Sequence, residues 1–341
     1  MKALDFNVTL RKLVEDTEPI SVASLYAFSS LERADTEKIN RAWPTIPVDR
    51  RQSAMQHLVE IAEENFEVDF NSIYRIGLTD PDPEVRAVAI GGLWEDTDPQ
   101  LIAPLIRDMQ SDPAESVRAA AAAALGQFVL AGEYDELPAQ KIEPVLDALQ
   151  ATYTKVAESV EVRRRALEAL AYHTFDALPE LIRSAYNDSH ELLRVSAVQA
   201  MGRSADEQWV KIVLAELQST NPEMRFEAAQ ACGMLEIPMA VKPLTQLVDD
   251  VDDQVQRMAI WSLGQIGGDA ARQVILHVLD GDQAYLHDAA DDALAELEFK
   301  SGNIDLKLLD IEDPDTDEDD DEDWLLEFID EENMDEDEEE V

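Results

Sequence analysis

The chain is poor in cysteine, glycine, proline and aromatic residues, and it has no long apolar run. Its 341 residues include one cysteine, Cys232, with 12 glycines and 15 prolines, and 6% of them are aromatic. A single cysteine excludes a disulfide within the chain and is typical of a reducing compartment. So few glycines and prolines exclude a collagen-like or linker character. Without a signal-peptide core or an apolar run of membrane-spanning length, we expect a cytoplasmic protein.

Basic residues are also scarce. The chain has 27 Lys and Arg against 74 Asp and Glu, a formal net charge of −47. This charge disfavours nonspecific binding to nucleic acid and to anionic membranes. It favours a basic partner, although solubility alone also accounts for a negative surface. The hydrophobic content of 45% is rich in alanine, which favours close-packed helices over sheets.

One short pattern recurs along the chain. The stretch "DPDPEVRAVAIGGLW" places Val85 as an anchor, and six later segments align with it at spacings of 32, 45, 31, 31, 31 and 31 residues. A period near 31 residues indicates a repeat architecture. The remaining anchors are Val117, Val162, Leu193, Met224, Val255 and Leu286.

The residues that follow each anchor predict a helix. Alanine stands four residues after all seven anchors, a small residue stands seven after, and an apolar residue stands eight after. Offsets of 0, 4, 7 and 8 lie on one helix face, and small residues there allow a neighbouring helix to approach closely. Four glycines nine residues after the anchor are interpreted as packing residues: Gly126, Gly202, Gly233 and Gly264.

A second helix is expected before each anchor, since segments such as "PQLIAPLIRDMQ" have apolar residues at helical spacing. The turn between the two helices contains cap residues. We interpret Asp112-Pro113-Ala114-Glu115 as N-cap, N1 and N3 of a capping box. The segment from Asp188 to Glu191 has the same pattern without the proline.

The repeated pattern "DPxxxVRxxAaxALG" resembles the HEAT family in its short form, related to the phycobilin-lyase HEAT-like repeats. The resemblance covers residues 45–298 and implies an all-α fold, a right-handed α-solenoid of about seven to eight two-helix repeats. The family spans scaffolds and a few enzymes, so the resemblance is weak for function.

The remaining segments are assigned from composition. Residues 1–44 are expected to form a helical cap over the first repeat. "PVDRRQSAMQHLVEIAEE" resembles a degenerate eighth second helix, with Ala54 and Leu58 in the apolar columns. The 45-residue spacing contains an insertion, "LAGEYDELPAQK", expected as a longer loop or an extended helix. Residues 299–309 are a candidate linker.

Residues 310–341 contain 21 acids and no Lys or Arg. Such a segment cannot fold alone because it repels itself and has little apolar area, so we expect a disordered acidic tail. The tail includes an apolar island at 324–329, which is either a binding motif or a chance cluster. Its apolar members are Trp324, Leu325, Leu326, Phe328 and Ile329.

No catalytic set is evident, and we expect neither a metal nor another cofactor. The histidines do not have metal-ligand spacing on one helix. HEAT-like hydroxylases bind iron through His-Glu pairs near the start of second helices. Here the one such pair, His190-Glu191, lies in a turn. No phosphate loop or nucleophile elbow is present either.

Two sets of residues on the second helices remain as candidates for a functional role. Arginines directly after the anchors are expected to bond turn carbonyls and acids of their own or the preceding repeat: Arg86, Arg118, Arg163, Arg194 and Arg225. Positions two, three, six and ten after the anchor are expected to face solvent on the concave surface. There the middle repeats have Arg, aromatic and amide residues, typical of binding hot spots, and Glu168. The first two repeats have mostly Ala, Gly or Val. The candidate groove residues are Arg164, Arg165, Tyr172, Gln199, Arg203, Phe226, Gln230, Met234, Arg257, Trp261 and Gln265.

The favoured hypothesis is a monomeric, non-catalytic scaffold that binds a protein segment on its concave face. The acidic tail is a candidate competitor for that face. One alternative is an enzyme or accessory subunit of the bilin-lyase-like or hydroxylase-like group. The other is an acidic binder of basic macromolecules.

Overall fold

The computed structural model describes residues 5–15 and 18–300, which belong to one compact unit, Met1–Ser301. The described residues form eighteen α-helices and short 3-10 turns, and no strand occurs among them. None of the helices in these ranges is long and apolar enough to cross a membrane. The expected all-α class is confirmed. The acidic segment 310–341 and its island, Trp324 to Ile329, lie outside the described residues.

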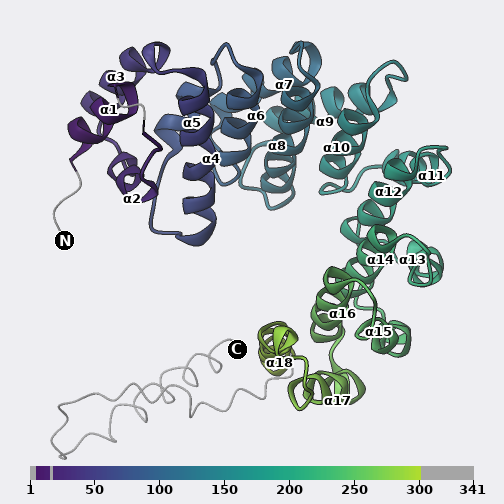
Figure 1. Cartoon of the computed structure of the whole chain (residues 1–341). Coiled ribbons are helices and arrows are strands. Elements are labelled where there is room, and N and C mark those ends of the chain that lie inside the picture. The colour runs from purple at the N-terminus through teal and green to yellow at the C-terminus, as the bar shows by residue number, and fades with distance from the viewer. Residues whose placement is uncertain (1–4, 16–17, 301–341) are drawn as a thin grey trace, which may run out of the picture. The chain divides into compact units, whose positions relative to one another are not determined.

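Seven helical hairpins follow one another along the chain. Their second helices are α6 (Pro83–Gly92), α8 (Glu115–Glu133), α10 (Val160–Leu170), α12 (Glu191–Arg203), α14 (Pro222–Met234), α16 (Asp253–Ile266) and α18 (His287–Lys300). Their first helices are α5 (Asn71–Gly77), α7 (Ile102–Ser111), α9 (Ala139–Thr154), α11 (Leu178–Tyr186), α13 (Val210–Glu216), α15 (Val241–Leu247) and α17 (Gly268–Leu279). Each second helix packs against the next, so α12, α14 and α16 form one row, with α11, α13 and α15 in a second row (Figure 1).

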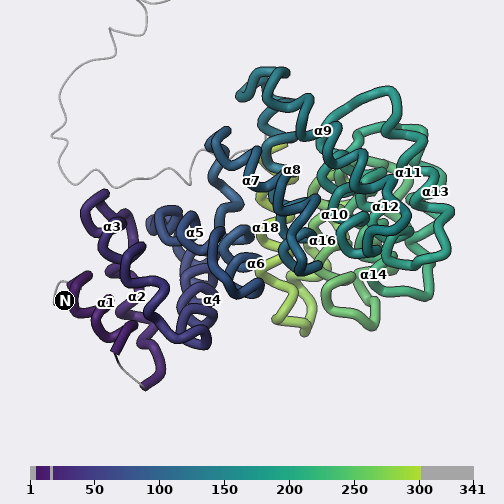
Figure 2. Tube along the Cα trace, turned by 90° about the horizontal axis from the view of Figure 1, so that it is seen from above, coloured from purple at the N-terminus to yellow at the C-terminus, as the bar shows by residue number. Residues whose placement is uncertain are grey.

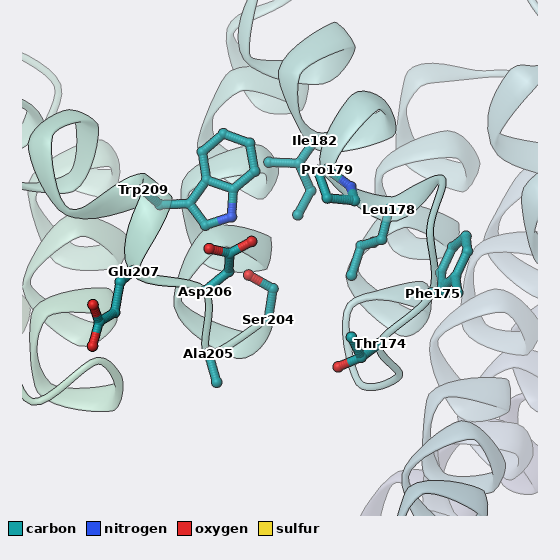
Figure 3. A pocket seen from close by; sticks show the side chains of 10 residues that line it. All are labelled: Thr174, Phe175, Leu178, Pro179, Ile182, Ser204, Ala205, Asp206, Glu207 and Trp209. Atoms are coloured by element: carbon teal, nitrogen blue, oxygen red, sulfur yellow. The ribbon is translucent and has the colours of Figure 1, made fainter.

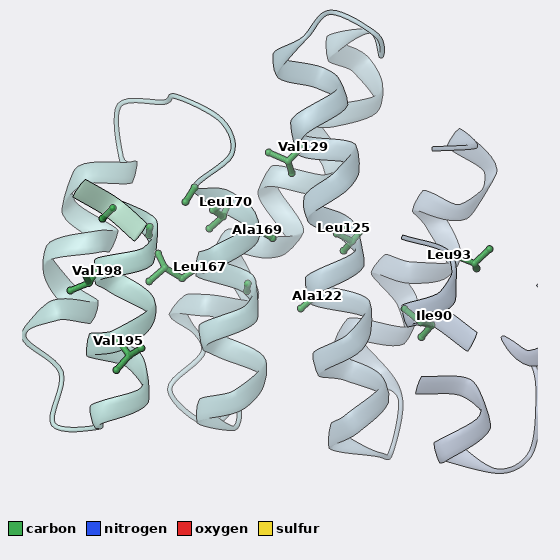
Figure 4. Packing of buried hydrophobic residues seen from close by; sticks show 14 of the residues in the cluster. Ile90, Leu93, Ala122, Leu125, Val129, Leu167, Ala169, Leu170, Val195 and Val198 are labelled. Carbon is green, nitrogen blue, oxygen red and sulfur yellow. The ribbon is translucent and has the colours of Figure 1, made fainter. Parts of the chain in front are cut away.

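The alanine column forms the spine of this array. All seven alanines four residues after the anchors are completely buried, and the anchors are at most 4% exposed. Buried residues of α6, α8, α10 and α12 continue from one helix to the next (Figure 4). An alanine at the contact lets two helix backbones approach within one side-chain layer. The spacing in the sequence therefore predicted the core correctly.

The glycines nine residues after the anchor also serve packing, as expected. A Cβ on Gly202 would lie 2.7 Å from the Ala231 Cα, and one on Gly264 would lie 2.7 Å from the Ala293 carbonyl oxygen. Both glycines lie inside their helices, α12 and α16. They permit contact between neighbouring second helices and do not terminate them.

The capping box at Asp112 is wrong by two residues. Helix α8 begins at Glu115 with Ala114 as its N-cap, and the Asp112 carboxylate accepts from the Ala114 N–H at 2.8 Å. Helix α12 likewise begins at Glu191, and the Asp188 carboxylate accepts from the N–H of its N-cap at 2.9 Å. Asp82, by contrast, is a true N-cap for α6.

The same acids join successive hairpins, which corrects the expectation for the arginines. Each arginine does bond carbonyls of its own turn, as Arg86 does with Asp80 at 2.8 Å. Where one of these arginines also pairs with an acid, that acid belongs to the following repeat. Arg194 bonds the carbonyl oxygens of Asp188 and Ser189 and forms no ion pair among the described residues. The Arg86 guanidinium donates to both Asp112 oxygens at 2.9 and 3.0 Å, and Arg225 donates to both Asp250 oxygens at 2.7 Å. We call this row the arginine ladder, with the pairs Arg51–Asp80, Arg86–Asp112, Arg118–Glu158, Arg163–Asp188 and Arg225–Asp250.

The N-terminal helices precede this array. Helix α4 (Val48–Glu64) packs on α6 as an eighth second helix, with Ala54 and Leu58 each 1% exposed. Helices α1 (Phe6–Glu15), α2 (Val22–Leu25) and α3 (Arg33–Ala42) come before it along the trace (Figure 2). The insertion at 130–141 lengthens the two helices that it connects, α8 of one hairpin and α9 of the next, around a turn at Asp135, whose φ is +59°.

Candidate functional site

The row of second helices contains an apolar groove over α6, α8 and the end of α10. Its cavity measures about 500 Å³, within the range of ligand and side-chain pockets. We call it the Trp94 groove. Its lining residues are Ile90, Gly91, Trp94, Ala120, Ala123, Ala124, Gln127, Leu130 and Tyr172.

The groove arises from a large aromatic residue beside very small ones. Trp94 follows the end of α6 and is 52% exposed. The α8 residues Ala120, Ala123 and Ala124 line the hollow beside it, and Gly91 is exposed. An exposed tryptophan next to an apolar hollow makes this groove a candidate contact site.

One polar atom of the groove lining lacks a partner. The Gln127 side-chain nitrogen donates to the carbonyl oxygens of Leu93 and Asp96, both at 3.2 Å. Its carbonyl oxygen, Oε1, is buried and accepts no hydrogen bond from any described residue. The amide is thus held in place by the turn after α6, while its buried oxygen is an acceptor without a donor among the described residues.

A charged cluster lies further along the same row of helices. Arg164 and Arg165 each pair with both Glu161 and Glu168, at 2.6 to 3.4 Å. The Arg203 guanidinium lies 4.4 Å from the centre of the Tyr172 ring and donates to the Glu168 carbonyl oxygen at 3.0 Å. We call this the Glu168 cluster: Glu161, Arg164, Arg165, Glu168, Ser196, Gln199, Arg203 and Glu227.

Two of its acids lie close together, Glu168 buried and Glu227 half-buried. Ser196 Oγ donates to Glu168 Oε1 at 2.5 Å, and Gln199 Nε2 donates to Glu227 Oε1 at 3.5 Å. Burial, and then the negative charge of Glu168, raise the pKa of Glu227 to about 7. Glu227 Oε2 and Gln199 Oε1 are buried without a partner among the described residues. A protonated Glu227 would fit this geometry, because its O–H can donate to Gln199 Oε1 while its other oxygen accepts from Gln199 Nε2.

Among the described residues no three His, Cys, Asp or Glu side chains gather so that they could hold a metal ion. Burial raises the pKa of the Cys232 thiol to about 12, which keeps it protonated.

Comparison with known proteins agrees with this architecture. A family model of HEAT repeats matches residues 75–157 and 210–295. This chain is a HEAT-repeat protein. No curated protein sequence matches it significantly.

Several solved structures are similar to this chain at low sequence identity. The CpcE–CpcF complex of phycocyanin lyase from Nostoc sp. PCC7120 is 16% identical with a TM-score of 0.51, covering 78% of this chain and 96% of that chain. Kap95p, which binds RanGDP, is 15% identical with a TM-score of 0.44, covering 86% and 45%. Human deoxyhypusine hydroxylase is 16% identical with a TM-score of 0.35, covering 86% and 96%. The likeness to the CpcE–CpcF complex concerns the fold alone.

Four of the residues predicted for the groove are engaged in a cluster with neighbouring acids. Arg164, Arg165, Gln199 and Arg203 belong to the Glu168 cluster, and Glu168 is buried, which corrects the expectation that its position faces solvent. Tyr172 alone among the predicted residues lines the Trp94 groove.

The other predicted residues lie on α14 and α16. Met234 and Arg257 are exposed, and the Arg257 guanidinium lies 5.9 Å from the Tyr285 ring centre. Trp261 packs over Gly233, and Gln265 accepts from Lys300 at 3.0 Å. Phe226 and Gln230 are half-buried.

The sequence reasoning missed the Trp94 groove. Gly91, Ala120, Ala123 and Gln127 occupy the same offsets from the anchor that were examined in the middle repeats. They were not predicted as a binding site because most of them are small residues. The available signal was the combination of several small residues at these offsets with one tryptophan beside them.

Proposed function

We propose that this HEAT-repeat protein is a non-catalytic scaffold that holds a segment of another protein in the Trp94 groove. The observation that supports this most is Trp94 itself, a large aromatic residue left 52% exposed beside a floor of alanines. Aromatic anchors that close an apolar pocket dominate the binding energy of protein interfaces. The free oxygen of Gln127 adds a directional contact for a donor on the partner.

The partner segment is expected to combine an apolar side chain with basic flanks. The chain has 47 more acidic than basic residues, and the exposed Glu95 follows Trp94 directly. The arginines of the Glu168 cluster are already engaged, Arg164 and Arg165 with its acids and Arg203 with the Glu168 carbonyl oxygen. The field at the groove therefore favours a positively charged segment.

A substitution that fills the groove tests this function. Ala123 is exposed and lines the groove, so Ala123→Arg would fill it without disturbing the core. Ala215→Arg, at an exposed alanine of the first helix α13, is the matched control. The measurement is quantitative mass spectrometry of proteins that co-purify with each variant from native cells.

At least one protein should co-purify with the wild type and with Ala215→Arg. We expect the amount of that protein recovered with Ala123→Arg to be about tenfold lower, as for loss of a hot spot. If the two variants retain the same proteins in the same amounts, the groove does not hold a partner.

The acidic segment 310–341 is proposed as a competitor for the face that includes residues 164–265, acting through its island from Trp324 to Ile329. Hydrogen exchange of the full chain and of a chain lacking residues 310–341 tests this. Faster exchange in the shortened chain would support docking, and unchanged protection would eliminate it.

The lyase-like or hydroxylase-like alternative has a separate test. Purified protein that contained a chromophore or iron would support it.

A further inference from the structure

A second cavity lies away from the Trp94 groove, beside the connections from α10 to α11 and from α12 to α13. It measures about 500 Å³, a size suited to one or two residues of a bound chain. Figure 3 shows its lining, which is apolar on one side and polar on the other. We call it the Trp209 pocket, and its residues are Thr174, Phe175, Leu178, Pro179, Ile182, Ser204, Ala205, Asp206, Glu207 and Trp209.

Trp209 provides an unused hydrogen-bond donor in this pocket. It ends the short 3-10 turn Glu207–Trp209, and its side chain is 1% exposed. Its indole nitrogen has no hydrogen-bond partner among the described residues. The Arg183 guanidinium lies over the ring, 5.2 Å from its centre. In Figure 3 the nitrogen edge of the ring is turned toward the pocket side on which Asp206 and Ser204 lie.

Asp206 provides an acceptor on the same side. Its Oδ1 accepts from the Gln208 N–H at 2.9 Å, and its other oxygen contacts the Gln208 side-chain amide. A carboxylate has about four lone-pair positions, so Asp206 can accept one more donor. Ser204 Oγ is already engaged, because it donates to the Met201 carbonyl oxygen at 2.9 Å.

A peptide group matches this pair of polar atoms. Its carbonyl oxygen can accept from the Trp209 N–H while an adjacent N–H donates to Asp206. The opposite wall, formed by Phe175, Leu178, Pro179 and Ile182, suits an aliphatic side chain. Buried donors gain most from such a partner, because they otherwise lack one.

Acidic residues lie in and beside the pocket lining. Glu207 lines the pocket and is exposed, and the exposed Asp176 and Glu180 follow the lining residues Phe175 and Pro179 in the chain. No ion pair involves these three carboxylates among the described residues, so a lysine or arginine next to the aliphatic residue would find a favourable negative potential.

We propose that the Trp209 pocket binds an extended peptide segment, with an aliphatic side chain against Leu178 and Ile182, its main chain between Trp209 and Asp206, and a basic residue beside it. This site does not depend on the Trp94 groove, so either could fail while the other stands.

NMR of the indole N–H groups in the full-length protein tests the proposal. The probes are three acetylated and amidated heptapeptides: Gly-Ser-Lys-Leu-Lys-Ser-Gly, its variant with both lysines replaced by glutamate, and its variant with the leucine replaced by glycine. The Trp209 signal is assigned as the one that disappears in Trp209→Phe. We expect the Lys-Leu-Lys peptide to move this signal downfield, as an N–H does when it gains an acceptor, and the other two peptides to leave it in place.

Blocking variants supply the control. Thr174 is exposed at the pocket, and Thr174→Trp would obstruct it without touching the core. Thr220→Trp makes the same change at an exposed threonine after α13. We expect the first variant to weaken binding of the Lys-Leu-Lys peptide by about tenfold and the second by less than about twofold.

The proposal is overturned if about 5 mM of the Lys-Leu-Lys peptide leaves the Trp209 signal unmoved, since weak specific contacts already bind near 1 mM. It is also overturned if Thr174→Trp binds the peptide as the wild type does. A shift of the Trp94 signal alone would overturn the pocket and leave the proposed groove standing.

Discussion

A glycine in this array raises or lowers stability according to what its missing Cβ would meet. A Cβ on Gly202 would lie 2.7 and 2.9 Å from two atoms of Ala231, whereas one on Gly91 would meet nothing within 4 Å. We expect Gly202→Ala to lower the free energy of unfolding by about 2 kcal/mol through overpacking. Gly91→Ala should raise it by about 0.5–1 kcal/mol, because alanine loses less entropy in a helix. Urea unfolding measures both, and equal effects would contradict the packing role.

The arginine ladder leads to a second prediction at this scale. The Arg225 and Asp250 side chains are 12% and 8% exposed. We expect Arg225→Met to lower the free energy of unfolding by about 2–3 kcal/mol, because it leaves a partly desolvated carboxylate without its partner. Arg33 is the matched control, since its pair with Glu37 is on the surface and its side chain is 93% exposed. Arg33→Met should change stability by less than about 0.5 kcal/mol; an equal loss in both variants would refute the ladder's contribution.

The sequence predicted the second helices better than it predicted where the helices begin. The second helices were predicted from the repeated residue types after each anchor. This worked because every repeat buries both its anchor and the alanine that stands four residues later. The helix starts were misplaced at Asp112 and Asp188, since an acid two residues before the N-cap reads like the cap itself. Those acids also form ion pairs with the arginine of the previous repeat, so the ladder runs in the opposite direction to the one expected.

The candidate site was less predictable for two physical reasons. The arginines of α10 appeared free to bind a ligand, yet Glu161 and Glu168 stand three or four residues from them, close enough to pair on the same helix. The Trp94 groove depends on the absence of side chains at Gly91, Ala120 and Ala123. A hollow of this kind arises only when α6, α8 and the end of α10 lie side by side.

The contact between α12 and α14, which includes Glu227, leads to a prediction about how stability depends on pH. The pKa of Glu227 is raised from 4.5 to about 7 by burial and by Glu168. Between these values the folded protein binds a proton that the unfolded chain has released, so stability falls as pH rises through this window. The expected loss between pH 4.5 and 7.5 is about 3 kcal/mol, from the size of the shift.

Urea unfolding at several pH values measures this effect. Glu227→Gln should remove the loss between pH 4.5 and 7.5, whereas Glu223→Gln, an exposed change on the same helix, should retain it. The lowered pKa values of Asp82, Asp188 and Glu158 affect stability in a different pH range. The stability that these ionised carboxylates add is lost only at more acidic pH. An unchanged pH profile in Glu227→Gln would show that Glu227 is ionised in the folded protein.

Over the whole molecule, the net charge of −47 opposes compaction. Raising the salt concentration from about 10 to 150 mM shortens the screening length from about 30 to 8 Å. We expect the melting temperature to rise over this range, since the ladder pairs are largely buried and are screened less. Removal of residues 310–341 leaves 53 acids against 27 bases and should reduce the salt dependence. A melting temperature that falls with salt would mean that surface ion pairs outweigh the repulsion.

The spine of alanines has a mechanical consequence. The extensive helix contacts join neighbouring hairpins, so a pull on the two ends would load every junction in series. Each junction includes a buried alanine, so the neighbouring second helices lie close together. Small rotations at many junctions would add up to a large extension before any one hairpin separates from its neighbour. We therefore expect the array to extend under tension and to recover its length when the tension is released.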